Sequence, residues 1–268
     1  MVRRVALLLG NIVLFWAATM LILAISSAIA THVSNAAFVT GAIAAPATFG
    51  LTLLFIRWRH QRLTDFGLAI CRGTWLRFCI GLTLGAFLIA AQTGIMWLAG
   101  GVRWVATTPT LAMLVPVLGY ILLATREELA FRGYPLRILA SETKPWVALL
   151  IVSALFAIEH KLGGSSWPAA LLGPGLGALV FGMAALATRG LALPIGLHAA
   201  WNIGDWLRGG KGDGGLWRTV VEPGAAAHAD RVAWTSYAVV MLSAFAVLSW
   251  WHRVHRHELG AACPIGSC

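Results

Sequence analysis

Residues 5–30 read VALLLGNIVLFWAATMLILAISSAIA, a run without a single Asp, Glu, Lys or Arg. A helix that crosses a bilayer needs about 20 mostly apolar residues, so this run is long enough to span a membrane. It also exceeds the apolar core of about 7–15 residues that marks a signal peptide, and more apolar runs follow it. We therefore predict a retained first transmembrane helix.

The composition of the whole chain supports a membrane protein. Hydrophobic residues make up 59% of the 268 residues and charged residues only 11%, against roughly 25% charged in soluble domains. The 13 Trp residues are typical of membrane interfaces. The net charge of +10 does not indicate nucleic acid binding, because the basic residues are scattered between apolar runs and form no dense tract.

Seven further helices are predicted from the remaining apolar runs. They cover residues 37–56, 78–99, 109–140, 146–160, 168–188, 191–207 and 234–251. The fourth should begin near Pro109, because proline suits the first turn of a helix. The predicted fold is all-α, a polytopic transmembrane helix bundle of about eight spans. Both termini are predicted to be cytoplasmic, since this orientation places most Arg and Lys on the inside.

Four cysteines offer little evidence of metal or disulfide chemistry. Cys71 and Cys79 lie in one segment, Cys263 and Cys268 lie in the tail, and none forms a CxxC pair. Neither a zinc knuckle nor a disulfide framework is therefore predicted.

Ionisable residues inside apolar helices are the strongest indication of a working site, because each costs about 2.5–3.5 kcal/mol on insertion scales. The first group is the run REELAFR, residues 126–132. Glu128 and Arg132 are four apart and can pair on one face. Glu127 points about 100° away and is left available for chemistry. A charged patch at the membrane interface is the alternative interpretation.

Two further groups follow along the chain. Phe156 and His160 share a face at the end of one helix, and His198 and Asn202 share a face of a later helix. Taken singly, His160 could be a hydrogen-bonded helix end, and the His198–Asn202 pair could be a polar clamp between helices.

Together the three groups contain the ingredients of a hydrolytic site. A carboxylate takes a proton from water, an imidazole helps to hold that water, and His and Asn side chains donate to an oxyanion. Alternatively, Glu127, His160 and His198 could bind zinc and leave a fourth position for water. The residue types alone do not decide between these two chemistries.

The three motifs, in this order on successive helices, resemble the signature motifs of the CAAX protease and bacteriocin-processing family (CPBP, also called ABI). The resemblance covers roughly residues 109–207. The residues that carry it are Glu127, Glu128, Arg132, Phe156, His160, His198 and Asn202. It implies a glutamic-type intramembrane endopeptidase, with a core of eight helices, in the cytoplasmic membrane of a bacterium.

The resemblance also implies roles for the motif residues. Glu127 would be the general base and His160 would share the nucleophilic water with it. His198 and Asn202 would form the oxyanion hole. The supporting residues would be Glu128 and Arg132. No cofactor is expected, zinc being the alternative, and the partners would be membrane lipid and a membrane-associated protein or peptide substrate, lipidated or not.

The chain is accordingly divided into three segments. Residues 1–108 hold N-terminal transmembrane helices and a basic cytoplasmic loop, and residues 109–207 hold the CPBP-like catalytic core. Residues 208–268 hold an extracytoplasmic Gly-rich loop, which should be flexible over residues 209–215, the last transmembrane helix and a cytoplasmic tail. Glu159 and Asp205 receive no role.

Two functions outside hydrolysis remain as alternatives. A non-catalytic, peptide-binding immunity protein would not need all four polar groups of the motifs. An ion-coupled transporter could relay protons through embedded Glu and His, but its usual inverted repeat is not visible in the sequence.

Overall fold

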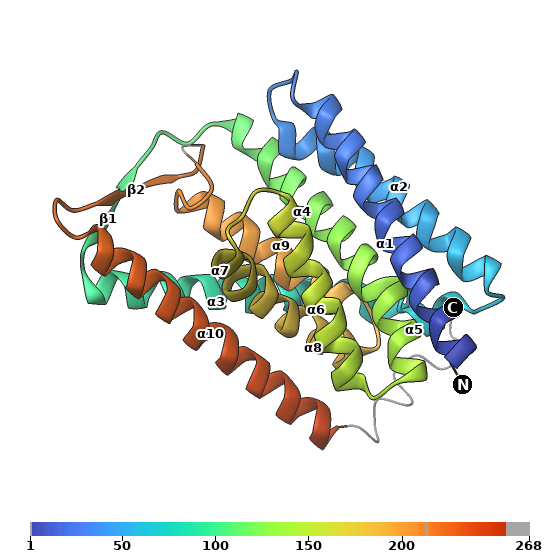
Figure 1. The fold of residues 1–268 in the computed structure, drawn as a ribbon. Coiled ribbons are helices and arrows are strands. Elements are labelled where there is room, and N and C mark those ends of the chain that lie inside the picture. The colour runs from blue at the N-terminus through green and yellow to red at the C-terminus, as the bar shows by residue number, and fades with distance from the viewer. Residues whose placement is uncertain (1, 213, 256–268) are drawn as a thin grey trace.

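The computed structural model describes residues 2–212 and 214–255, and most of them are in helices that form one bundle (Figure 1). The all-α membrane bundle predicted from the apolar runs is confirmed. The α-helices are α1 Val2–Ala30, α2 Ala36–Trp58, α3 Arg72–Ala99, α4 Leu114–Glu128, α5 Tyr134–Glu142, α6 Pro145–Leu162, α7 Trp167–Ala170, α8 Leu176–Thr188, α9 Ala192–Leu207 and α10 Ala226–Val254. Shorter helical segments are the 3-10 turns η1 Leu63–Phe66 and η2 Leu111–Met113, and the π-helical segments η3 Leu129–Gly133 and η4 Leu171–Gly175.

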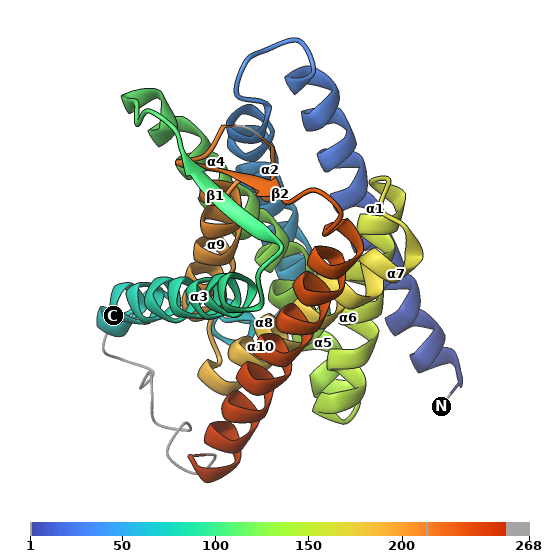
Figure 2. The same ribbon diagram turned by 90° about the vertical axis from the view of Figure 1, so that its left-hand side faces the viewer.

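Within the described residues, six helical stretches are long and apolar enough to cross a membrane. They are α1, α2, α3, α6, the α7–η4–α8 stretch and α10. The helices α4 and α9 have 15 and 16 residues, which is short for a bilayer. The start of α1 and the end of α10 lie low in both views, away from the β strands (Figures 1 and 2). Eight spans and the cytoplasmic side of the termini stay predictions, and Cys263 and Cys268 lie outside the described residues.

Three helices begin elsewhere than predicted. The helix α3 begins at Arg72 rather than near residue 78, and α10 begins at Ala226 rather than near residue 234. Both begin with a stretch that contains charged residues, Arg72 and Arg77 in α3 and Asp230 and Arg231 in α10, so an apolar run does not include it. Pro109 does not begin α4, which starts at Leu114 and has Pro116 in its first turn, where proline is tolerated.

The described chain also contains two short strands that the sequence did not predict. Strand β1, Val102–Ala106, pairs antiparallel with β2, Trp217–Val221. Thr107 continues this ladder by donating its N–H to Leu216 O (2.9 Å), so the chain is still extended where Pro109 follows. The strands join the connection after α3 to the connection before α10 at one end of the bundle (Figure 2).

Helices α3 and α9 approach closely through glycines. A Cβ atom on Gly81 would meet Leu193 O, and one on Gly196 would meet Phe78 O, so both positions need the bare backbone. Small residues allow this kind of close helix packing inside membranes. The contact fixes α9, the helix that carries His198, against α3.

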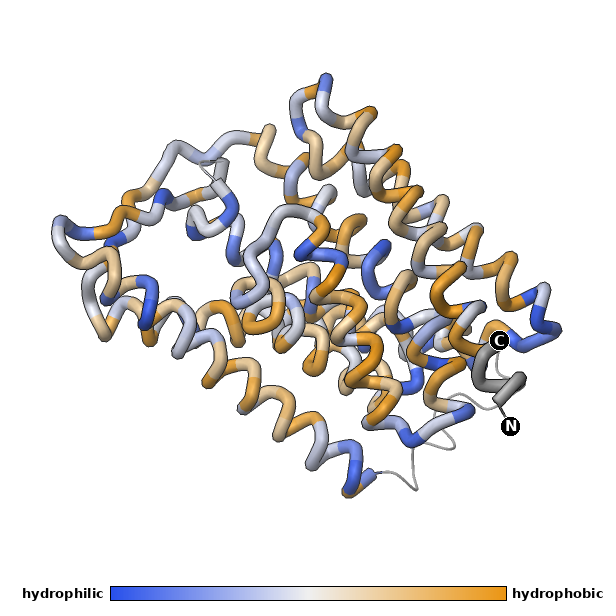
Figure 3. The backbone as a smooth tube through the Cα atoms, viewed as in Figure 1, coloured by the Kyte–Doolittle hydropathy of each residue, from blue (hydrophilic) through white to orange (hydrophobic). Residues whose placement is uncertain are grey.

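The outer faces of the bundle are apolar, as lipid contact requires. Leu21 on α1 and Val247 on α10 expose 62% and 61% of their surface, and Figure 3 shows hydrophobic residues along both helices with hydrophilic residues gathered in the connections. Charged side chains are instead buried at the centre: Arg126, Glu128 and Arg132 are fully buried. Apolar side chains thus face outward and charged side chains face inward, which places the polar site inside the bundle.

Candidate active site

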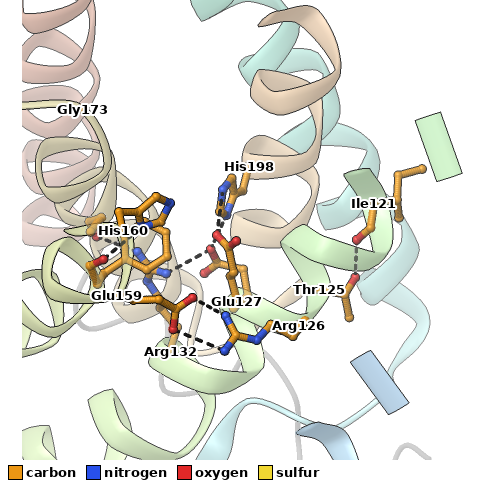
Figure 4. Close-up of polar contacts among 12 residues, drawn as sticks. Ile121, Thr125, Arg126, Glu127, Arg132, Glu159, His160, Gly173 and His198 are labelled. Carbon is orange, nitrogen blue, oxygen red and sulfur yellow. Dashed lines mark hydrogen bonds and ion pairs between the residues drawn. The ribbon is translucent and has the colours of Figure 1, made fainter. Parts of the chain in front are cut away.

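The three predicted motifs meet inside the bundle. Glu127 comes from the end of α4, His160 from the last turn of α6, and His198 from the middle of α9 (Figure 4). His160, His198 and Asn202 line one cavity of about 510 Å³. Three of the four predicted site residues therefore share this cavity, and Glu127, whose Oε2 atom lies 3.4 Å from His198 Nε2, is not among the residues that line it.

His198 lies between the two adjacent glutamates. Its Nδ1 atom is 2.8 Å from Glu128 Oε1, and its Nε2 atom is 3.4 Å from Glu127 Oε2. Consecutive residues on a helix point about 100° apart, which lets the two carboxylates approach opposite sides of one ring. Glu128 is fully buried, whereas the Glu127 side chain keeps 17% of its surface exposed. Glu127 is thus the carboxylate with access to another molecule.

Glu128 also holds Arg132, the partner predicted from the i,i+4 spacing. Arg132 Nη1 lies 3.3 Å from Glu128 Oε1, and Arg132 Nη2 donates to Ala178 O on α8 (3.3 Å). The helix widens to a π-helix over Leu129–Gly133, the segment that contains Arg132. Such π-helical segments are frequent at functional sites because they displace side chains from the regular helical positions.

Three phenylalanine rings surround the Arg132 guanidinium. Its central carbon lies 4.6 Å from the Phe156 ring centroid and 5.7 Å from those of Phe131 and Phe181. Phe181 also stacks on His198 at 4.2 Å. Phe181 could not be singled out from the sequence, because it is one of many apolar residues in α8. The motif residue Phe156, in contrast, has a definite place between the arginine and the two histidines.

The orientation of His160 follows from its own helix. Its Nδ1 atom lies 2.9 Å from Phe156 O, and a carbonyl oxygen only accepts hydrogen bonds. Nδ1 therefore carries the proton in this contact, and in the neutral ring Nε2 is left as an acceptor. The Phe156 ring packs on the imidazole at 4.5 Å.

The rest of the cavity combines aromatic and polar side chains. Its apolar walls include Trp201, Trp234 and Tyr237. Asp205, which the sequence left without a role, pairs with Arg208 (2.9 Å), and both line the cavity. Gly209 next to this pair has a positive φ of 85°, which favours glycine. A cavity with aromatic walls and several polar groups suits a ligand that carries both apolar and hydrogen-bonding groups.

The zinc alternative requires Glu127, His160 and His198 to gather as ligands. In the part of the chain that the structure describes, no group of three His, Cys, Asp or Glu side chains is placed to hold a metal ion. Glu128 engages one nitrogen of His198, an arrangement that also occurs around metal-bound histidines, so the choice between the glutamic and the zinc-dependent mechanism stays a prediction.

Fold and site together define a helical membrane protein with a carboxylate–histidine centre inside its bundle. Residues 108–204 match a family model described as "Type II CAAX prenyl endopeptidase Rce1-like". This segment contains all three motifs, so the resemblance to the CAAX protease and bacteriocin-processing family is confirmed over it. The match supports a membrane-embedded protease of the CAAX type in general terms. No curated protein matches the chain.

Proposed function

We propose that this protein is an intramembrane endopeptidase that uses Glu127 to activate water against a peptide bond of a membrane-associated protein or peptide. The observation that carries the proposal is the position of Glu127: its Oε2 atom lies 3.4 Å from His198 Nε2, beside a cavity that His160, His198 and Asn202 line. The family match over the same residues supports the reaction class.

The proposed first step is attack by water. Glu127 accepts one proton from a water molecule whose oxygen adds to the carbonyl carbon of the substrate. His160 accepts a hydrogen bond from the same water through Nε2, since its Nδ1–H is bound to Phe156 O. The product of this step is a tetrahedral intermediate with a negatively charged oxygen.

His198 and Asn202 are proposed to stabilise that oxygen. With both ring nitrogens protonated, His198 donates Nδ1–H to Glu128 and presents Nε2–H to the oxyanion. Asn202 donates from its amide one helical turn further along α9. Glu127 then returns its proton to the leaving nitrogen, the C–N bond breaks, and a carboxylic acid and an amine are released.

The decisive substitution is Glu127→Gln, which keeps the size of the side chain and removes the base. Purified protein in detergent would be incubated with a prenylated peptide and with a transmembrane peptide, and cleavage would be followed by mass spectrometry. We expect kcat to fall by about 10²–10⁴-fold, the usual contribution of a general base. Glu222→Gln is the matched control, because Glu222 is an exposed residue in the connection between β2 and α10. Cleavage by Glu127→Gln at the wild-type rate would overturn the proposal.

The same preparations separate the two non-hydrolytic functions. An immunity-type binding protein would retain the intact peptide without cleaving it. An ion-coupled transporter would leave both peptides intact and instead move protons with a solute across liposome membranes.

A further inference from the structure

Arg126 and Glu159 are the sequence neighbours of two proposed catalytic residues, and they bind each other. The Arg126 guanidinium contacts both oxygens of the Glu159 carboxylate, through Nη1–Oε1 and through Nη2–Oε2 (3.3 Å). Figure 4 shows this pair on α4 and α6, with Glu127 turned instead toward His198. Each residue therefore ties its own helix to the other helix immediately beside a catalytic side chain.

A third helix joins the same guanidinium. Arg126 Nη2 also donates to Thr19 O on α1 (3.1 Å). The Arg126 side chain is fully buried and that of Glu159 keeps 5% of its surface exposed. The two charged groups are engaged with each other and with the Thr19 carbonyl, so we expect the pair to act through its neighbours and not on the substrate.

Stability alone is a weak explanation for such a pair. Removing two charges from water costs several kcal/mol, and apolar replacements of buried ion pairs are often neutral or stabilising. A two-pronged arginine–carboxylate contact does, however, fix distance and orientation more narrowly than apolar packing does. A narrow geometry is what a water-activating pair on two separate helices requires.

We propose that Arg126 and Glu159 are positioning residues that set the spacing of α4 and α6, so that Glu127 and His160 face one water molecule. The inference rests on the proposed endopeptidase function. The pair sets the separation of the two helix ends, and the Thr19 carbonyl adds α1 as a third support. The cavity walls come from α3, α8, α9, α10 and the connection after α9 as well as from α6, so we expect substrate binding to change less than kcat.

The test replaces the pair by apolar residues of similar size, Arg126→Met with Glu159→Leu. The double variant should fold, because no buried charge is left without its partner. We expect kcat to fall by about 10–100-fold while KM stays within about twofold.

Arg126→Lys in the otherwise native chain keeps the positive charge but cannot make a bidentate contact with the Glu159 carboxylate. Its kcat should therefore lie between those of the wild type and the double variant. Ser153→Ala is the control on α6. Ser153 is buried without a side-chain hydrogen bond in the described structure, so removing its hydroxyl should leave kcat unchanged.

A second readout needs no substrate. Spin labels on cysteines introduced by Leu118→Cys and Leu150→Cys, both exposed positions on α4 and α6, report the distance between the helices in a background without native cysteines. The distance distribution should broaden in the double variant. If that variant does not fold, Arg126→Lys, which keeps a positive charge opposite Glu159, is measured in the same two ways.

The outcomes distinguish the inference from the function on which it rests. Failure of the wild type to cleave either peptide would count against the endopeptidase, and the label distances would still test the positioning role. If the wild type cleaves, Glu127→Gln does not, and the apolar double variant keeps both wild-type kcat and an unchanged distance distribution, then Arg126 and Glu159 do not position the site.

Discussion

His198 Nδ1 lies 2.8 Å from Glu128 Oε1, and this buried contact holds the imidazole in the orientation that turns Nε2 toward Glu127. We therefore expect Glu128→Gln to lower kcat by about 10–100-fold, because an amide still accepts the hydrogen bond but no longer carries the charge that holds a protonated ring. The measurement is kcat and KM on the cleaved peptide for Glu128→Gln, with Glu222→Gln measured in parallel as the control. An unchanged kcat would show that Glu128 does not support the chemistry through His198.

Asn202 is expected to act on the oxyanion and not on substrate binding. It lines the cavity one turn after His198, so Asn202→Ala removes a donor at the place where charge develops. We predict a loss of about 10²–10³-fold in kcat with little change in KM, as for other oxyanion donors. Asn11→Ala is the matched control, because Asn11 donates to Leu7 O within α1, far from the cavity along the chain. A rise in KM alone would assign Asn202 to binding.

The long apolar runs predicted the helices because a helix in contact with lipid must consist mostly of apolar residues. Starts of helices were harder to predict, since Arg72 and Arg77 on the first turns of α3 look like loop residues. The strands β1 and β2 were missed for another reason. Each has five residues, and their partners lie more than a hundred positions apart, so neither has a periodicity that can be recognised locally.

In the site, too, contacts within one helix could be predicted from the sequence, whereas contacts between helices could not. Spacing of four predicted the Glu128–Arg132 pair, which the structure forms (3.3 Å). Spacing cannot relate Arg126 to Glu159, because they come from different helices and meet only after packing. The position of His198 between two glutamates is likewise a result of how α9 sits against α4.

Metal removal is expected to leave the activity unchanged. The proposed reaction needs a carboxylate, two histidines and an amide. Among the described residues, no three His, Cys, Asp or Glu side chains are grouped closely enough to bind zinc. Incubation with EDTA or 1,10-phenanthroline, followed by dialysis, should therefore give the same kcat as mock treatment. Loss of activity that added zinc restores, and that magnesium does not, would favour the zinc-dependent reaction.

The close approach of α3 and α9 predicts that Gly85 tolerates no side chain. A Cβ atom there would meet Leu197 O and lie 2.8 Å from Ala200 Cβ, on either side of His198. Gly85→Ala should therefore push α9 outward, destabilise the protein by about 1–3 kcal/mol and lower kcat as well. Gly94→Ala is the control on the same helix, because a Cβ at Gly94 meets nothing within 4 Å. There the loss of backbone freedom in the unfolded chain should raise stability by about 0.5–1 kcal/mol. Thermal unfolding of both variants in one detergent measures the difference, and equal midpoints would mean that α3 and α9 do not depend on glycine contact.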